Sequence, residues 1–144
     1  MAAEEYACAQ AWATLSAAHG RVRERLAADL IHSCGLSIND FEILLRLDRA
    51  PGLRLRLGEL NKSVPLTQPA LSRAVTRLAE RGLLAREGTP DDGRGVLVVL
   101  RPAGQEALRQ AISVHALAIR EALLDHLSAG EQRLLADVLR RVSA

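Results

Sequence analysis

The residues best suited to chemistry in this chain are polar side chains that recur at helical spacing after Thr67. Glutamine and arginine can each form two hydrogen bonds with a base edge in the DNA major groove, to adenine and guanine respectively. We assign the base-contacting role to Gln68, Ser72, Arg73 and Arg77, and the phosphate-contacting role to Thr67 and Thr76. The competing interpretation is that some of these side chains only cap or solvate the helix. The spacing predicts a helix that lies in the major groove.

A second candidate is the loop Pro90-Asp91-Asp92-Gly93-Arg94-Gly95, in which Arg94 stands between two glycines. An arginine on such a tip can enter a narrow minor groove, where negative potential is concentrated. The alternative is a hairpin tip that is merely exposed to solvent. Lys62, Ser63, Arg81 and Arg86 lie on either side of the helix and are candidates for phosphate contacts, which position a protein on DNA without reading its sequence.

The distribution of charge agrees with this interpretation. The chain has 144 residues and a formal net charge of only +2. Residues 53–101 hold nine basic and five acidic side chains, a net charge of +4, and the rest of the chain carries −2. A basic centre suits a phosphate-facing surface, although a solvated arginine surface would give the same balance.

Hydrophobic periodicity and turn residues predict the elements that must position these side chains. An amphipathic helix covers 5 to about 33 and ends at Gly35, and a second, capped by Asn39 or Asp40, runs to about Asp48. The Leu/Arg alternation over 53–57 predicts an edge strand. Residues 58–63 and the helix after Thr67 form the helix-turn-helix, with Gly82 as its stop. Strands at 83–86 and 96–100 flank the loop. Pro102 begins a long helix, and Ser128 with Glu131 has the spacing of a capping box ahead of a final helix.

Composition excludes several classes of protein. Hydrophobic residues make up 49% of the chain, which is typical of a globular protein, and strong helix formers dominate. No signal peptide and no membrane-spanning run is recognisable, so we expect a cytoplasmic protein. No nucleophile elbow, phosphate-binding loop, dinucleotide motif or metal-ligand pair is present, so we expect no enzyme, no cofactor and no metal. Cys8 and Cys34 are too few for a disulfide framework; redox sensing is the less favoured interpretation, because the apolar stripe around Cys8 predicts burial.

The whole pattern resembles the MarR family of winged helix-turn-helix regulators, over about residues 5–142. The resemblance rests on Asp92-Gly93-Arg94 with the strand to Leu100, and on Leu71-Ser72-Arg73 through Leu78, Glu80-Arg81-Gly82-Leu83 and Arg86. It departs from the family pattern at Arg101, where threonine is usual, and at the proline pair Pro65 and Pro69.

The resemblance implies a mainly α fold, namely a winged helix-turn-helix with a small antiparallel β wing, flanked by long N- and C-terminal dimerisation helices. It implies a dimerisation region at 1–34 and 102–144 and a DNA-binding lobe at 35–101. In the wing, Asp92 would hold Arg94. An effector pocket would be lined by Trp12, His19, Arg23, Glu42 and His115, although packed histidines are the simpler interpretation.

From these observations we predict a homodimeric transcriptional regulator, a repressor, that binds a pseudo-palindromic site on double-stranded DNA. A small-molecule effector would relieve binding by changing the spacing of the two lobes. The alternative is a winged-helix module that binds proteins and not DNA. A basic helix and wing on one side favour the first, because a protein adaptor does not need them.

Overall fold

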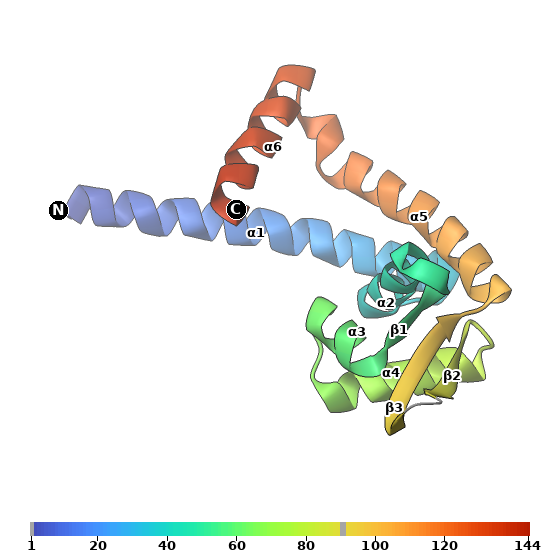
Figure 1. The fold of residues 1–144 in the computed structure, drawn as a ribbon. Coiled ribbons are helices and arrows are strands. Elements are labelled where there is room, and N and C mark those ends of the chain that lie inside the picture. Colours follow the sequence, from blue (N-terminus) through green and yellow to red (C-terminus); the bar gives the residue numbers. More distant parts are fainter. Residues whose placement is uncertain (1, 90–91) are drawn as a thin grey trace. The chain divides into compact units, whose positions relative to one another are not determined.

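The computed structural model describes residues 2–89 and 92–144, with side chains for all of these except 89 and 92–94. The helices are α1 (Ala2–Cys34), α2 (Ile38–Arg49), α3 (Leu57–Ser63), α4 (Gln68–Glu80), α5 (Pro102–Ala122) and α6 (Ala129–Ser143). The strands are β1 (Arg54–Arg56), β2 (Leu84–Thr89) and β3 (Asp92–Leu100), and 3-10 turns cover Pro51–Leu53 and Leu124–His126. Figure 1 shows this mainly helical fold with its small sheet, in the order predicted from the sequence.

The chain forms two compact units. One unit is Leu30–Ser113, and the other combines Met1–Asp29 with Val114–Ala144. The helices α1 and α5 each contribute to both units. The functional division predicted at residues 34/35 and 101/102, between dimerisation and DNA binding, stays a prediction.

The unit Leu30–Ser113 is built around a leucine-rich core. Its largest fully buried side chains come from every helix of the unit and from the sheet: Leu30, Leu36, Ile43, Leu44, Leu47, Leu60, Leu71, Val75, Leu78, Leu84, Val98 and Leu108. Each such side chain stabilises the folded state by roughly 1.5–3 kcal/mol, because its apolar surface is removed from water. The apolar side of α4 (Leu71, Ala74, Val75 and Leu78) is therefore fixed in the core, which leaves its polar side outward.

The sheet is antiparallel with the strand order β1-β3-β2. The predicted edge strand is confirmed at Arg54–Arg56, where Leu55 pairs with Val98. The prediction for the wing strands was too short, because β2 extends to Thr89 and β3 already begins at Asp92. A register shift at Gly88/Thr89 allows strand pairing to continue into the polar segment. The alternation of apolar residues in the sequence cannot indicate such a shift.

The prediction for the N-cap of α2 was also wrong. Ser37, and not Asn39 or Asp40, is the cap: its hydroxyl accepts a hydrogen bond from the Asp40 backbone N–H at 3.0 Å. The Asp40 carboxylate accepts one from the Ser37 N–H at 3.1 Å, which completes a capping box. All three residue types are good caps, so their order in the chain could not decide between them.

One glycine permits an unusually close approach of α5 to the hairpin. A Cβ added at Gly104 would lie 2.0 Å from the Leu83 carbonyl oxygen and 2.6 Å from Leu100 Cδ1. The same carbonyl oxygen accepts a hydrogen bond from the Arg101 N–H at 3.1 Å. Only glycine fits the first turn of α5 at this distance. Gly35 and Gly82, which end α1 and follow α4, both have positive φ, as their predicted role requires.

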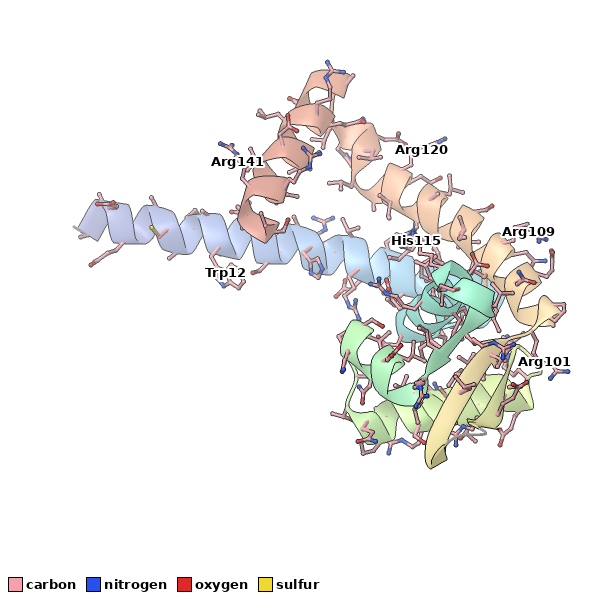
Figure 2. All side chains as sticks on the ribbon, in the orientation of Figure 1. Trp12, Arg101, Arg109, His115, Arg120 and Arg141 are labelled. Carbon is pink, nitrogen blue, oxygen red and sulfur yellow. The ribbon has the colours of Figure 1, made fainter. Side chains whose placement is uncertain are left out.

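The unit formed by Met1–Asp29 and Val114–Ala144 carries much exposed apolar surface. In α1, Tyr6 is 73% and Trp12 71% exposed, and Figure 2 shows Trp12 standing out from the helix. Cys8 is exposed as well, which contradicts the predicted burial. The predicted capping box of α6 is confirmed, with Ser128 and Glu131 bonded reciprocally. Asp29 and Glu121 both accept hydrogen bonds from Arg25, and these bonds raise the pKa of its guanidinium.

Candidate nucleic-acid interface

The helix α4 presents the predicted polar face. Thr67 caps it, as predicted, because the Thr67 hydroxyl accepts a hydrogen bond from the Ala70 N–H at 3.3 Å. Pro69 lies in the first turn, where its missing N–H costs nothing. The predicted contact residues of this helix are all exposed except Ser72, which is half-buried; they are Thr67, Gln68, Arg73, Thr76 and Arg77. The prediction that these side chains share one outward side is therefore confirmed.

Most of that face forms one shallow hollow of about 330 Å³, lined by Ser72, Arg73, Thr76, Arg77 and Glu80. Within the part of the chain that the structure describes, Arg73 has no hydrogen bond or ion pair. Its planar guanidinium is therefore available for the two-bond geometry that suits guanine. Glu80 was not among the predicted residues, and its carboxylate opposes the approach of phosphate at the C-terminal end of the hollow.

A second hollow, of about 340 Å³, opens beside the N-terminal end of α4. Its lining joins four segments of the unit: Arg56, Leu57, Gly58, Glu59, Lys62, Gln68, Gly95 and Val96. The predicted residues Lys62 and Gln68 meet here. Arg56 joins them, although it was not predicted as a site residue. Its signal in the sequence was the Leu/Arg alternation over 53–57, which predicts the arginines on the solvent side of the strand.

Three of the predicted DNA-contacting arginines make hydrogen bonds inside this unit. Arg77 Nη2 lies 3.3 Å from Asp40 Oδ1. Arg81 donates to the Gly35 carbonyl at 2.8 Å and to the Cys34 carbonyl at 3.5 Å. Arg86 donates to the Ser72 carbonyl at 2.7 Å and to its hydroxyl at 3.1 Å. Each of them therefore holds α4 against another element, and their contacts with DNA stay predictions.

The predicted hydroxyl contacts are engaged locally. Ser63 Oγ donates to the Leu60 carbonyl at 3.1 Å, and Thr76 Oγ1 donates to the Ser72 carbonyl at 3.0 Å. Each hydroxyl oxygen keeps the capacity to accept a further hydrogen bond. The structure places Asp92 and Arg94 at the start of β3 by their backbone, but their side chains lie outside the described part, so the predictions for both stay open.

The predicted effector residues are divided between the two units. His19 lines an apolar hollow of about 200 Å³ with Leu15, Ala18, Val22, Leu123, Leu135 and Leu139. Trp12 and Arg23 are exposed, and His115 is half-buried. Glu42 belongs to the unit Leu30–Ser113, where it lies 3.8 Å from Arg46. The five-residue pocket stays a prediction.

Other kinds of site find little support in the described part of the chain. Residues 2–89 and 92–144 contain no cluster of three or more His, Cys, Asp or Glu side chains that could bind a metal ion. Both cysteines are free thiols, with Cys34 half-buried. None of the described helices is long and apolar enough to cross a membrane.

Comparison with known proteins agrees with the geometry. The model of the MarR family matches residues 35–95. The HTH-type transcriptional regulator YdgJ of Bacillus subtilis (strain 168) is 32% identical over 108 residues, which are 75% of this chain and 64% of YdgJ. The chain thus spans less than two thirds of that relative. The multiple antibiotic resistance protein MarR of Salmonella typhimurium is 28% identical over 83% of this chain and 82% of its own length.

A solved structure extends the similarity to nearly the whole chain. Sco3205, a MarR family transcriptional regulator from Streptomyces coelicolor that was crystallised in complex with DNA, superposes with a TM-score of 0.82. The two proteins are 32% identical, and the match covers 93% of this chain and 84% of Sco3205. The chain belongs to the MarR family of winged helix-turn-helix transcriptional regulators.

Proposed function

We propose that this protein is a homodimeric repressor that binds a pseudo-palindromic DNA site through α4 and the β2–β3 wing. The observation that carries the proposal is the outward face of α4, where Arg73, which has no hydrogen bond or ion pair to any described residue, lies in a hollow with Ser72, Thr76 and Arg77. The arrangement suits a helix that presents hydrogen-bond donors to base edges. Sco3205, which has the same fold, was crystallised with DNA.

The proposed dimer covers the apolar surface of the terminal helices. A groove of about 720 Å³ runs between α1 and α6, and nearly all of its lining is apolar: Ala7, Gln10, Ala11, Thr14, Leu15, Ala18, Leu135, Val138, Leu139 and Val142. Val142 is 75% and Leu134 62% exposed in the single chain. A monomer rarely exposes a contiguous apolar surface of this kind. A second copy of the chain, which carries the same surface, is the occupant we propose.

The experiment that tests DNA binding is selection of bound duplexes from random DNA by the purified full-length chain. The selected site is then titrated in a gel shift at several salt concentrations. We expect a palindromic consensus and an affinity that falls steeply with salt, with a log–log slope of about −0.9 for each phosphate contacted. A failure to enrich any sequence, together with no binding to any duplex at low salt, would refute the proposal and favour a protein-interaction module.

Repression and its relief form the second part of the proposal. Small phenolic and metabolic acids are added to the complex of the protein with its selected site, and release of DNA is measured. An acid that releases DNA must bind the DNA-free conformation more tightly than the DNA-bound one. A reporter gene placed behind the selected site, with and without the repressor gene, then establishes the sign of regulation. We expect lower expression with the repressor gene, and higher expression would make the protein an activator.

A further inference from the structure

Asp40 is a buried carboxylate with two separate tasks. Asp40 lies at the start of α2 and is only 7% exposed. One carboxylate oxygen, Oδ2, accepts the hydrogen bond from the Ser37 N–H that completes the capping box. The other, Oδ1, accepts a hydrogen bond at 3.3 Å from Nη2 of Arg77, on the recognition helix α4. Burial of a carboxylate is unfavourable unless it is paired and hydrogen-bonded, and both oxygens of Asp40 are satisfied in this way.

Among the residues whose side chains are described, the Arg77 side chain is held by one contact, with Asp40. It is 58% exposed and lines the hollow with Ser72, Arg73 and Thr76. Because only Nη2 is bonded to Asp40, the remaining N–H groups of the guanidinium can still donate. An arginine fixed at one nitrogen has already lost part of its rotamer freedom, so it loses less on binding DNA.

We propose that Asp40 is a positioning residue that orients Arg77 of α4 for sequence-specific DNA binding. The inference rests on the DNA-binding function proposed above and extends it to a residue of another helix. Asp40 does not touch DNA in this proposal, and it acts through Arg77. Its contribution is therefore to discrimination between sequences and not to general attraction of DNA.

The charge of Asp40 allows its proposed positioning role to be distinguished from a purely electrostatic effect on DNA binding. Replacing Asp40 with asparagine removes a negative charge near a DNA-binding surface, which by electrostatics alone strengthens binding to every duplex. Loss of a positioning contact instead weakens binding to the selected site. The two explanations predict opposite signs for the affinity of that site.

The test compares Asp40→Asn with wild type and with Asp48→Asn. Asp48 lies on the same helix, is exposed, and has no hydrogen bond or ion pair within the described residues, so its variant makes the same charge change without the contact. Affinities for the selected site and for a scrambled duplex are measured at one salt concentration. For Asp40→Asn we expect the ratio of the two affinities to fall roughly three- to thirtyfold, which lies within the range of coupling between side chains in direct contact. Asp48→Asn should leave the ratio unchanged.

Two further variants identify the partner. In an Arg77→Gln background, Asp40→Asn should have no further effect on the ratio, because its effect passes through Arg77. Asp40→Glu keeps both the charge and the residue preferred at this position of a capping box, so we expect it to retain most of the wild-type ratio.

Folding is checked by circular dichroism and thermal unfolding. An asparagine at position 40 keeps an oxygen that can accept the Ser37 N–H, so the cap is retained. If this variant nevertheless failed to fold, Arg77→Lys would replace it. A lysine keeps the positive charge but lacks the planar guanidinium with its paired N–H donors. An unchanged ratio of the affinities for the selected site and the scrambled duplex would overturn the proposal. If wild type binds the selected site and Asp40→Asn behaves like Asp48→Asn, Asp40 has no positioning role. If wild type binds no duplex, the function proposed above fails and this inference fails with it.

Discussion

The close approach of α5 to the hairpin makes Gly104→Ala the most informative substitution for the fold. The added Cβ would lie 2.0 Å from the Leu83 carbonyl oxygen, 2.6 Å from Leu100 Cδ1 and 2.9 Å from the Leu83 carbonyl carbon. Real contacts of a Cβ at such distances essentially do not occur, so something must move. The backbone at Leu83 is hard to displace, because its carbonyl also accepts the Arg101 N–H at 3.1 Å.

The expected magnitude follows from two opposing contributions. Overpacking costs about 1–3 kcal/mol, and two of the three close atoms belong to the backbone, which places this site at the upper end. Replacement of glycine by alanine in a helix gains at most about 1 kcal/mol. We therefore expect the free energy of unfolding to fall by about 2 kcal/mol, which for a domain of this size lowers Tm by roughly 5–8 °C.

The assay is urea unfolding followed by circular dichroism, at one protein concentration because the proposed dimer makes stability concentration-dependent. Gly58→Ala is the matched control, since Gly58 lies in the first turn of α3 and a Cβ there meets nothing within 4 Å. We expect the control to be neutral or slightly stabilising. A Gly104→Ala protein as stable as the control variant would show that the close approach does not constrain the fold.

Three further predictions follow from the wing, the proposed dimer and a helix cap. Arg94→Ala should weaken binding to the selected site roughly 5- to 150-fold in the same gel shift, which corresponds to the roughly 1–3 kcal/mol of a good contact to DNA; unchanged affinity would remove the role assigned to the wing. Leu139→Asp places a carboxylate in the apolar groove of α1 and α6, so analytical ultracentrifugation should detect a shift from dimer to monomer. The control Asp137→Asn, on the exposed side of the same helix, should leave the dimer intact. Ser128→Ala removes the cap of α6 and should cost about 1 kcal/mol in urea unfolding, and Ser143→Ala at the other end of α6 should cost less.

The recognition helix was predictable because local rules decide it. The apolar residues Leu71, Val75 and Leu78 repeat at helical spacing, Thr67 is a good cap and Gly82 is a good stop. The spacing therefore determines both where the helix lies and which side faces out. The wing strands were predicted too short for the opposite reason. Their outer parts are polar, and their pairing depends on a register shift that leaves no periodic signal.

The contacts of the arginines could not be predicted from the sequence. Arg77 pairs with a carboxylate 37 positions away, and Arg86 with Ser72, which is 14 positions away. Charge and spacing indicate that these side chains face outward, but not which neighbour the fold brings to them. Trp12 and Cys8 illustrate the same limit. Their apolar stripe indicates that a surface must be covered, and it does not indicate whether this chain or another copy covers it.

The bonds from Arg81 to the carbonyls of Cys34 and Gly35 have a consequence for how this protein can evolve. A main-chain carbonyl is present whatever side chain occupies the position. The link between the end of α4 and the end of α1 therefore survives sequence drift at position 34, and only a change of Arg81 itself, or of the left-handed turn at Gly35, would break it. The thiol at that position can be removed without cost to this link, which leaves Cys8, exposed in the single chain, as the one thiol of the sequence.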